Sequence, residues 1–137
     1  MIARLSRRFQ IAAVILLIYW GTIFVGTHVP GSMLGEPNFW DKALHFLAYA
    51  GLAFLLACVR GYRSPPTLRT YLGLLALVAL YGVVDELLQL VVPNRYADIK
   101  DWCADMLGAI AGLATYAAGR FIVGRVRSLN RQPADVG

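Results

Sequence analysis

The chain has 137 residues, of which 58% are hydrophobic and only 15% are charged, and its mean hydropathy is +0.58. Soluble domains are nearer half apolar and a quarter charged, so this composition excludes an ordinary soluble domain and indicates one domain in a bilayer. The net charge of +5 does not indicate nucleic-acid binding, because most basic residues lie in three clusters that flank apolar runs. The clusters are Arg4, Arg7 and Arg8; Arg60, Arg63 and Arg69; and Arg120, Arg125, Arg127 and Arg131.

Four apolar segments are each long enough to cross the hydrocarbon core, which takes about 20 helical residues. We predict them at roughly residues 9–29, 41–59, 70–92 and 101–123, followed by a flexible tail at 125–137. Short cytoplasmic segments carry an excess of Arg and Lys, so the three basic clusters predict that both termini are cytoplasmic. The expected fold is an all-α integral membrane protein, a bundle of four transmembrane helices forming a single domain over residues 1–137.

The first segment has a rival interpretation as a cleaved signal peptide, since Arg4, Arg7 and Arg8 resemble an n-region. Its apolar run is long for a signal peptide, however, and no clear A-x-A cleavage motif follows. Tyr19 and Trp20 would lie in mid-span and are expected to pack against other helices rather than to sit at the interface. Residues 30–40 are rich in Gly and Pro and predict an external loop.

The second segment begins with a polar pair and a histidine. Asp41 is suited to cap the helix N-terminus. His45 lies four residues later, one turn deeper on the same face. It is either a structural histidine bonded to a neighbouring helix or part of a site, and the sequence leaves both readings open.

The third segment is featureless until its outer end, where Asp85, Glu86 and Gln89 appear, and Pro93 then predicts a turn. Gln89 is at helical spacing from both carboxylates. In the turn, Asp98 is a candidate N-cap for the next helix. With Asp101 three residues later it would make a start resembling a capping box.

The fourth segment carries two carboxylates and two glycines on one narrow face, namely Asp101, Asp105, Gly108 and Gly112. The G-x-x-x-G pattern allows close approach of another helix. The face therefore packs inward, and the carboxylates with it. Ionisable groups within membrane segments are costly, so they usually face a bundle interior and mark function.

Polar residues of three segments are predicted to reach similar depth on the external side. At 1.5 Å per residue, His45 and Asp105 lie about 6 Å below the surface and Glu86 about 10 Å below it. This coincidence predicts a shared pocket in the outer leaflet. Arg95, in the turn, is expected to pair with a carboxylate there, because an unpaired charge at this place is costly.

The blocks DKALHFLAY, DELLQLVVPNRYADIKD and CADMLGAIAG resemble the VanZ-like family of small bacterial membrane proteins, over more than half of the chain. Two departures from the family pattern are visible: Asn94 stands where Gly is frequent, and Asp105 where Asn is frequent. The residues that match the pattern are Asp41, Lys42, His45, Glu86, Gln89, Pro93, Arg95, Asp98, Asp101, Gly108 and Gly112.

The resemblance implies a cell-envelope role in the bacterial cytoplasmic membrane. The family is named for a protein linked to low-level resistance to the glycopeptide teicoplanin. The expected partners are membrane lipids and, as alternatives, a lipid-linked cell-wall precursor or a glycopeptide. Oligomers are compatible with the sequence, and nucleic acid is excluded. The candidate ligand-binding residues are Asp41, Lys42, His45, Glu86, Gln89, Arg95, Asp98, Asp101 and Asp105.

Three functions remain open from the sequence. In the first, Arg95 and Lys42 grip an anionic head group and carboxylates bond amines or sugar hydroxyls. In the second, the protein is an enzyme on a lipid-linked substrate, with His45, Glu86 or Asp105 as acid and base. In the third, the polar residues only hold the helices together. Hydrolysis by such an enzyme would need water, or a metal held by His45 and the carboxylates. The spacing of the histidine and carboxylates matches no metal signature, so neither a metal nor a cofactor is expected.

Overall fold

The computed structural model describes residues 6–30 and 39–130, and in the second range it describes side chains from residue 41 onward. Four helices make up most of these residues. The helices are α1 (Arg7–Thr27), α2 (Phe39–Gly61), α3 (Leu68–Gln89) and α4 (Ile99–Leu129). Each is long and apolar enough to cross a membrane, and the described residues contain no strand. The predicted all-α membrane fold with four spans is confirmed.

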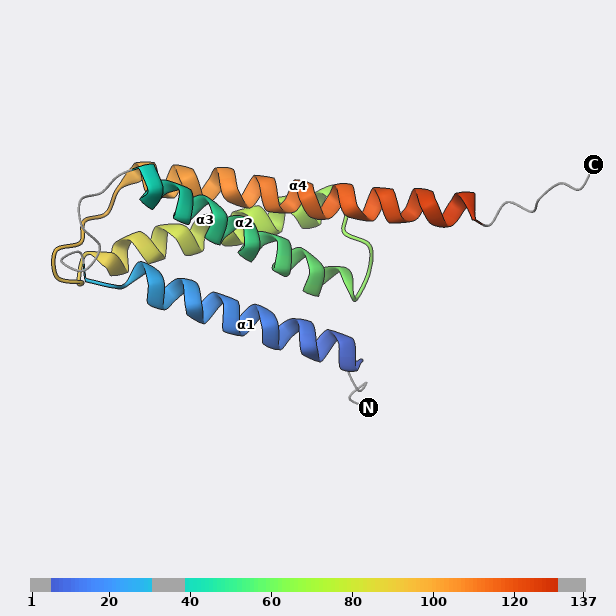
Figure 1. Cartoon of the computed structure of the whole chain (residues 1–137), viewed down its shortest axis with the longest axis horizontal. Helices are drawn as coiled ribbons and strands as arrows, with labels where there is room; N and C mark the ends of the chain where they lie inside the picture. The colour runs from blue at the N-terminus through green and yellow to red at the C-terminus, as the bar shows by residue number, and fades with distance from the viewer. Residues whose placement is uncertain (1–5, 31–38, 131–137) are drawn as a thin grey trace, which may run out of the picture.

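Successive helices run in opposite directions along one axis (Figure 1). Consequently α1 and α3 end, and α2 and α4 begin, at the same end of the bundle. We call this the polar end, because it carries the polar residues singled out in the sequence. The arginine-flanked ends of the helices gather at the opposite end.

The closest helix pair is α2 with α4, and two glycines make it possible. A Cβ atom at Gly108 would collide with the carbonyl oxygen of Phe46, and one at Gly112 with the carbonyl oxygen of Ala50. The G-x-x-x-G face therefore lies directly on the α2 backbone, as predicted. This contact sets the first turns of α2 and α4 side by side.

Helix α1 is more peripheral, since only Ile23 and Thr27 are buried along its length. Its tyrosine ties it to α2: the Tyr19 hydroxyl donates to the carbonyl oxygen of Ala48 at 3.1 Å, beside Gly51. The predicted packing role of this mid-span aromatic residue is confirmed. Most of the remaining α1 surface is apolar and exposed, which suits contact with lipid.

Two helix ends differ from the sequence-based boundaries. Helix α3 ends at Gln89, and residues 90–93 form turns ahead of Asn94, which has a positive φ of 58°. Helix α4 continues to Leu129, so the flexible tail predicted from Arg125 is wrong for residues 125–129. No proline interrupts the chain there before Pro133, and the residues after Gly124 have ordinary helix propensity. Residues 131–137 of the predicted tail lie outside the described part.

Candidate functional site

The outermost polar contact joins the starts of α2 and α4. Lys42 Nζ lies 2.7 Å from Asp101 Oδ1 and 3.2 Å from Asp98 Oδ2. Lys42 is half-buried, whereas the Asp101 side chain is nearly covered. One ammonium group thus neutralises part of the charge of two carboxylates, and the ion pair fixes the first turn of α4 against α2.

Asp98 also performs the predicted capping role. It is the N-cap of α4, and its Oδ1 accepts a hydrogen bond from the backbone N–H of Lys100 at 2.8 Å. That bond, together with Lys42, holds the pKa of the Asp98 carboxyl below its ordinary value. The capping-box arrangement suggested for Asp101 is not formed by its carboxylate, which is bound by Lys42 instead.

His45 and Asp105 lie one turn deeper and are both buried, with 4% and 0% of their surface exposed. His45 Nδ1 is 3.0 Å from Asp105 Oδ1. The aspartate is held there by the Gly108–Gly112 face, which presses α4 onto α2. A carboxylate bonded to one ring nitrogen orients the imidazole and leaves Nε2 for another partner.

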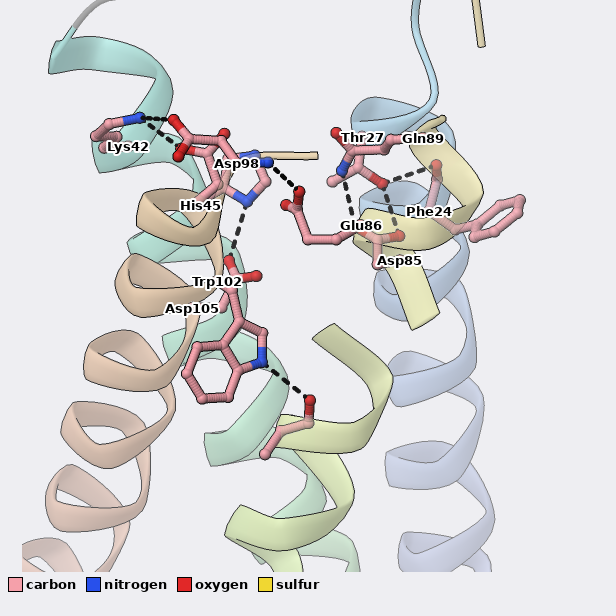
Figure 2. A network of polar contacts seen from close by, with 12 residues as sticks. Phe24, Thr27, Lys42, His45, Asp85, Glu86, Gln89, Asp98, Trp102 and Asp105 are labelled. Carbon is pink, nitrogen blue, oxygen red and sulfur yellow. Dashed lines mark hydrogen bonds and ion pairs between the residues drawn. The ribbon is translucent and has the colours of Figure 1, made fainter. Parts of the chain in front are cut away.

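Glu86 enters from α3 and completes the group. Its Oε2 accepts a hydrogen bond from the backbone N–H of Asp98 at 2.8 Å, and the residue is 7% exposed. One possible ligand atom from each of His45, Glu86 and Asp105 lies within 4.8 Å of the others. Figure 2 shows the Glu86 side chain reaching toward His45 and Asp105. The predicted convergence of these three helices is therefore present in the structure. We call Lys42, His45, Glu86, Asp98, Asp101 and Asp105 the central cluster.

Asp85 belongs to a second group, although it neighbours Glu86 in sequence. Thr27 Oγ1 donates to Asp85 Oδ1 at 3.0 Å, and Gln89 Nε2 donates to Asp85 Oδ2 at 3.3 Å. His28 Nδ1 lies 3.8 Å from the same carboxylate. Consecutive helical residues point about 100° apart, so α3 sends Glu86 toward α2 and α4 and Asp85 toward α1.

Arg95 does not make the carboxylate pair expected from the sequence. Its guanidinium donates to the carbonyl oxygen of Thr27 at 3.0 Å, and no described carboxylate lies within ion-pairing distance of it. The reason is the end of α1, where the terminal carbonyls lack helical partners and attract a cation. Arg95 therefore binds the end of α1 and makes no contact of this kind with the central cluster.

The remaining candidates divide between the two groups. Asp41 can join His45 and Asp101 in a second set of converging ligand atoms. Gln89 is bonded to Asp85 and is buried, so its amide is already engaged.

Two residues that make polar contacts near the polar end, Thr27 and Trp102, were not predicted from the sequence. A threonine in an apolar segment gives little signal, since its hydroxyl is usually bonded to its own helix. Trp102 donates from Nε1 to the carbonyl oxygen of Ala79 at 3.2 Å and holds α4 against α3. Its position at one helical turn from Asp98 could have suggested a role beside the cluster.

A groove of about 460 Å³ opens beside the central cluster, between α3 and α4. Its apolar walls meet two polar groups, Glu86 and Asp98. The apolar lining residues are Val83, Leu87, Ala97, Ile99 and Trp102. A surface of this kind suits an amphiphile whose chain lies along the apolar walls and whose head group meets the carboxylates.

Fold and site define a class: a multi-pass membrane protein with a buried, carboxylate-rich cluster at one end of a four-helix bundle. The chain belongs to the VanZ/LLP1 family, whose model matches residues 4–122. Comparisons with curated proteins and with solved structures gave no match. The family resemblance seen in the sequence is confirmed, and the match covers α1, α2, α3 and α4 as far as residue 122.

Proposed function

We propose that this protein is a cell-envelope protein of the bacterial cytoplasmic membrane that binds a lipid or lipid-linked cell-wall precursor at its polar end. The groove between α3 and α4 carries the proposal, because apolar walls lead to the Glu86 and Asp98 carboxyl groups. Glu86 Oε1 is buried and has no hydrogen-bond partner among the described residues. An acceptor in that state favours a ligand with hydroxyl or amide donors.

The charge distribution favours a hydroxyl-bearing head group over a bare phosphate. The central cluster has four carboxylates and one ammonium group, and that ammonium already binds Asp98 and Asp101. Arg95, the other cation expected to grip an anion, donates to a backbone carbonyl. Sugars of a glycolipid or of a lipid-linked precursor supply hydroxyls without adding negative charge. A glycopeptide, suggested by the family association with teicoplanin resistance, would supply the same donors.

The basic clusters support an orientation with both termini in the cytoplasm. The polar end would then lie in the outer leaflet, where lipid-linked precursors and glycopeptides meet the membrane. Arginines at the far end of the bundle, such as Arg60 and Arg120, would face the cytoplasmic headgroups.

The test is selective lipid retention. The purified protein is reconstituted in nanodiscs with galactosyldiacylglycerol, diacylglycerol or phosphatidic acid of the same acyl chains, and bound lipid is measured by native mass spectrometry. We expect retention in the order galactolipid, diacylglycerol, phosphatidic acid. Ala97→Trp places a bulky side chain in the groove and should abolish that preference. Ala114→Trp, on an exposed face of α4 outside the groove, is the matched control.

Equal retention of the three lipids, or an unchanged preference in Ala97→Trp, would overturn the proposal. Glycopeptide susceptibility of cells that express the same variants gives an independent readout. A change in susceptibility that follows Ala97→Trp but not Ala114→Trp would support the cell-envelope role.

A second candidate is an enzyme acting on a lipid head group or a lipid-linked phosphate. The observation that favours it is the His45–Asp105 contact at 3.0 Å, with Glu86 close by, since such a pair can accept and return a proton. Release of labelled head group from reconstituted substrate, lost in His45→Gln, would distinguish the enzyme from a protein that only binds.

A further inference from the structure

We propose that His45, Glu86 and Asp105 form a binding site for one divalent transition metal ion of the zinc type. The sequence spacing hides this possibility, because the three residues come from three different helices. In the folded chain their ligand atoms converge within 4.8 Å, and all three side chains are buried. Nitrogen and carboxylate oxygen are both ordinary zinc ligands.

The separations suit an ion. Ligand atoms at about 2.0–2.2 Å from a tetrahedral zinc ion lie roughly 3.3–3.5 Å from one another. His45 Nδ1 and Asp105 Oδ1 are hydrogen-bonded at 3.0 Å, already near that separation, and an ion bound by both atoms would replace the proton between them. Glu86 has to move inward by at most about 1.5 Å, which a change in its side-chain torsions provides.

Two buried oxygen atoms point to a missing positive partner. Glu86 Oε1 and Asp105 Oδ2 are both inaccessible and have no hydrogen-bond partner within the described ranges. Asp105 is fully buried and Glu86 is 7% exposed. The other oxygen of each carboxylate is bonded, Glu86 Oε2 by the Asp98 N–H and Asp105 Oδ1 by His45. A buried carboxylate oxygen without a donor or cation is costly, so two such oxygens near one histidine favour a bound cation.

Neighbouring hydrogen bonds and charges favour the set of His45, Glu86 and Asp105 over a second possible set of ligands. The backbone N–H of Asp98 donates to Glu86 Oε2, which is the kind of outer hydrogen bond that orients a metal-binding carboxylate. The rival set of Asp41, His45 and Asp101 is weaker, because Lys42 already occupies Asp101 at 2.7 Å. Within the described part of the chain, no ammonium group lies within ion-pairing distance of Glu86 or Asp105.

Three protein ligands leave one position of a tetrahedral ion open. Glu86 also lines the groove between α3 and α4, so an oxygen atom of a molecule in the groove is suited to fill that position. The metal site does not rest on lipid binding. An ion can be bound whether or not the groove selects a glycolipid, and the two are measured separately.

The experiment uses the full chain, purified in detergent with an affinity tag that contains no histidines. The protein is stripped with a chelator, reloaded with Zn²⁺ or Co²⁺, desalted and analysed for metal by mass spectrometry. We expect one ion per chain, and for Co²⁺ the intense visible absorption of a four-coordinate ion. His45→Ala, Glu86→Gln and Asp105→Asn should each weaken Zn²⁺ binding by about tenfold or more.

Asp85→Asn is the matched control, since Asp85 is a buried carboxylate next to Glu86 whose oxygens are bonded to Thr27 and Gln89. It should keep the metal. Absence of Zn²⁺ and of the Co²⁺ spectrum from wild-type protein would overturn the proposal, even if the variants fail to fold. Metal loss in Asp41→Asn and Asp101→Asn, with Glu86→Gln still loaded, would overturn the assignment to these three residues.

Discussion

The backbone N–H of Asp98 donates a hydrogen bond to Glu86 Oε2 at 2.8 Å, across the turn between α3 and α4. The Asp98 side chain simultaneously caps α4 and binds Lys42 of α2. One residue therefore connects three helices at the polar end. This turn positions the Glu86 carboxylate through a backbone hydrogen bond, and no described lysine or arginine lies within ion-pairing distance of it.

That relationship predicts different outcomes for two substitutions of Glu86. Glu86→Gln keeps an oxygen that can accept from Asp98, so thermal stability in chelator should change little. Glu86→Leu leaves the Asp98 N–H without its acceptor and should cost about 1–3 kcal/mol. Melting temperatures of the two variants in detergent check this. Equal destabilisation by Gln and Leu would mean that the charge, and not the hydrogen bond, holds the turn.

Lys42→Met is expected to destabilise the protein, because it leaves Asp98 and the nearly covered Asp101 without their ammonium partner. We expect a loss of about 1–3 kcal/mol, less than for a fully buried pair because Lys42 is half-exposed. Adding Asp101→Asn should recover part of that loss, since it removes the uncompensated charge. A double variant less stable than Lys42→Met alone would contradict this account.

Gly108→Ala should destabilise the α2–α4 contact, although alanine is the better helix former by about 1 kcal/mol. Its Cβ atom would collide with the carbonyl oxygen of Phe46, so the helices must separate. Gly119→Ala is the control, since a Cβ atom there meets nothing within 4 Å. Opposite signs of the change in melting temperature are expected, and a Gly108→Ala variant as stable as Gly119→Ala would contradict the close packing.

The Asp98 carboxyl should make stability depend on pH in the acid range. Its pKa is lowered in the folded chain, chiefly by the Lys100 N–H. Its contribution is therefore complete above the ordinary value of 3.8 and is lost as the pH falls through the folded pKa. Asp98→Asn retains a capping side chain but removes this titration. The difference in melting temperature between wild type and Asp98→Asn should shrink between pH 5 and pH 3, and a difference that grows would be the wrong sign.

Membrane orientation is tested with reporter fusions. Fusions after Arg63 and after Gln132 should report a cytoplasmic position, and one within residues 30–36 an external position. The physical reason is the arginine excess at one end of the bundle. An external C-terminus would reverse the orientation and move the proposed ligand site to the inner leaflet.

Helix number, the glycine contact and the convergence of His45, Glu86 and Asp105 were predictable, because they follow from helical periodicity and span length. The partner of Arg95 was not. Its carbonyl acceptor belongs to the end of α1, and a sequence does not reveal which helix end will face a distant side chain. The division of Asp85 from Glu86 likewise depends on the rotation of α3 about its axis.

The family pattern gains a physical reason at Asn94. The residue has a φ of 58°, in the left-handed region, where glycine is unstrained and asparagine is tolerated. The frequent glycine at this position and the asparagine of this chain therefore satisfy the same backbone requirement. The substitution does not indicate a change in the ligand.

Helix α4 has 31 residues, about 46 Å of helix, whereas the hydrocarbon core is about 30 Å thick. Its last buried residue is Tyr116, and the final turns of the helix, with Arg125 and Arg127, are exposed and extend beyond the other helices (Figure 1). The glycine contact with α2 lies between those turns and Asp105. The helix runs about 25 Å from Gly112 to Leu129 and about 14 Å from Gly108 to Ile99. The arginine-bearing end of α4 is therefore long enough to extend past the hydrocarbon core, while the glycine contact keeps the polar end of the same helix on α2.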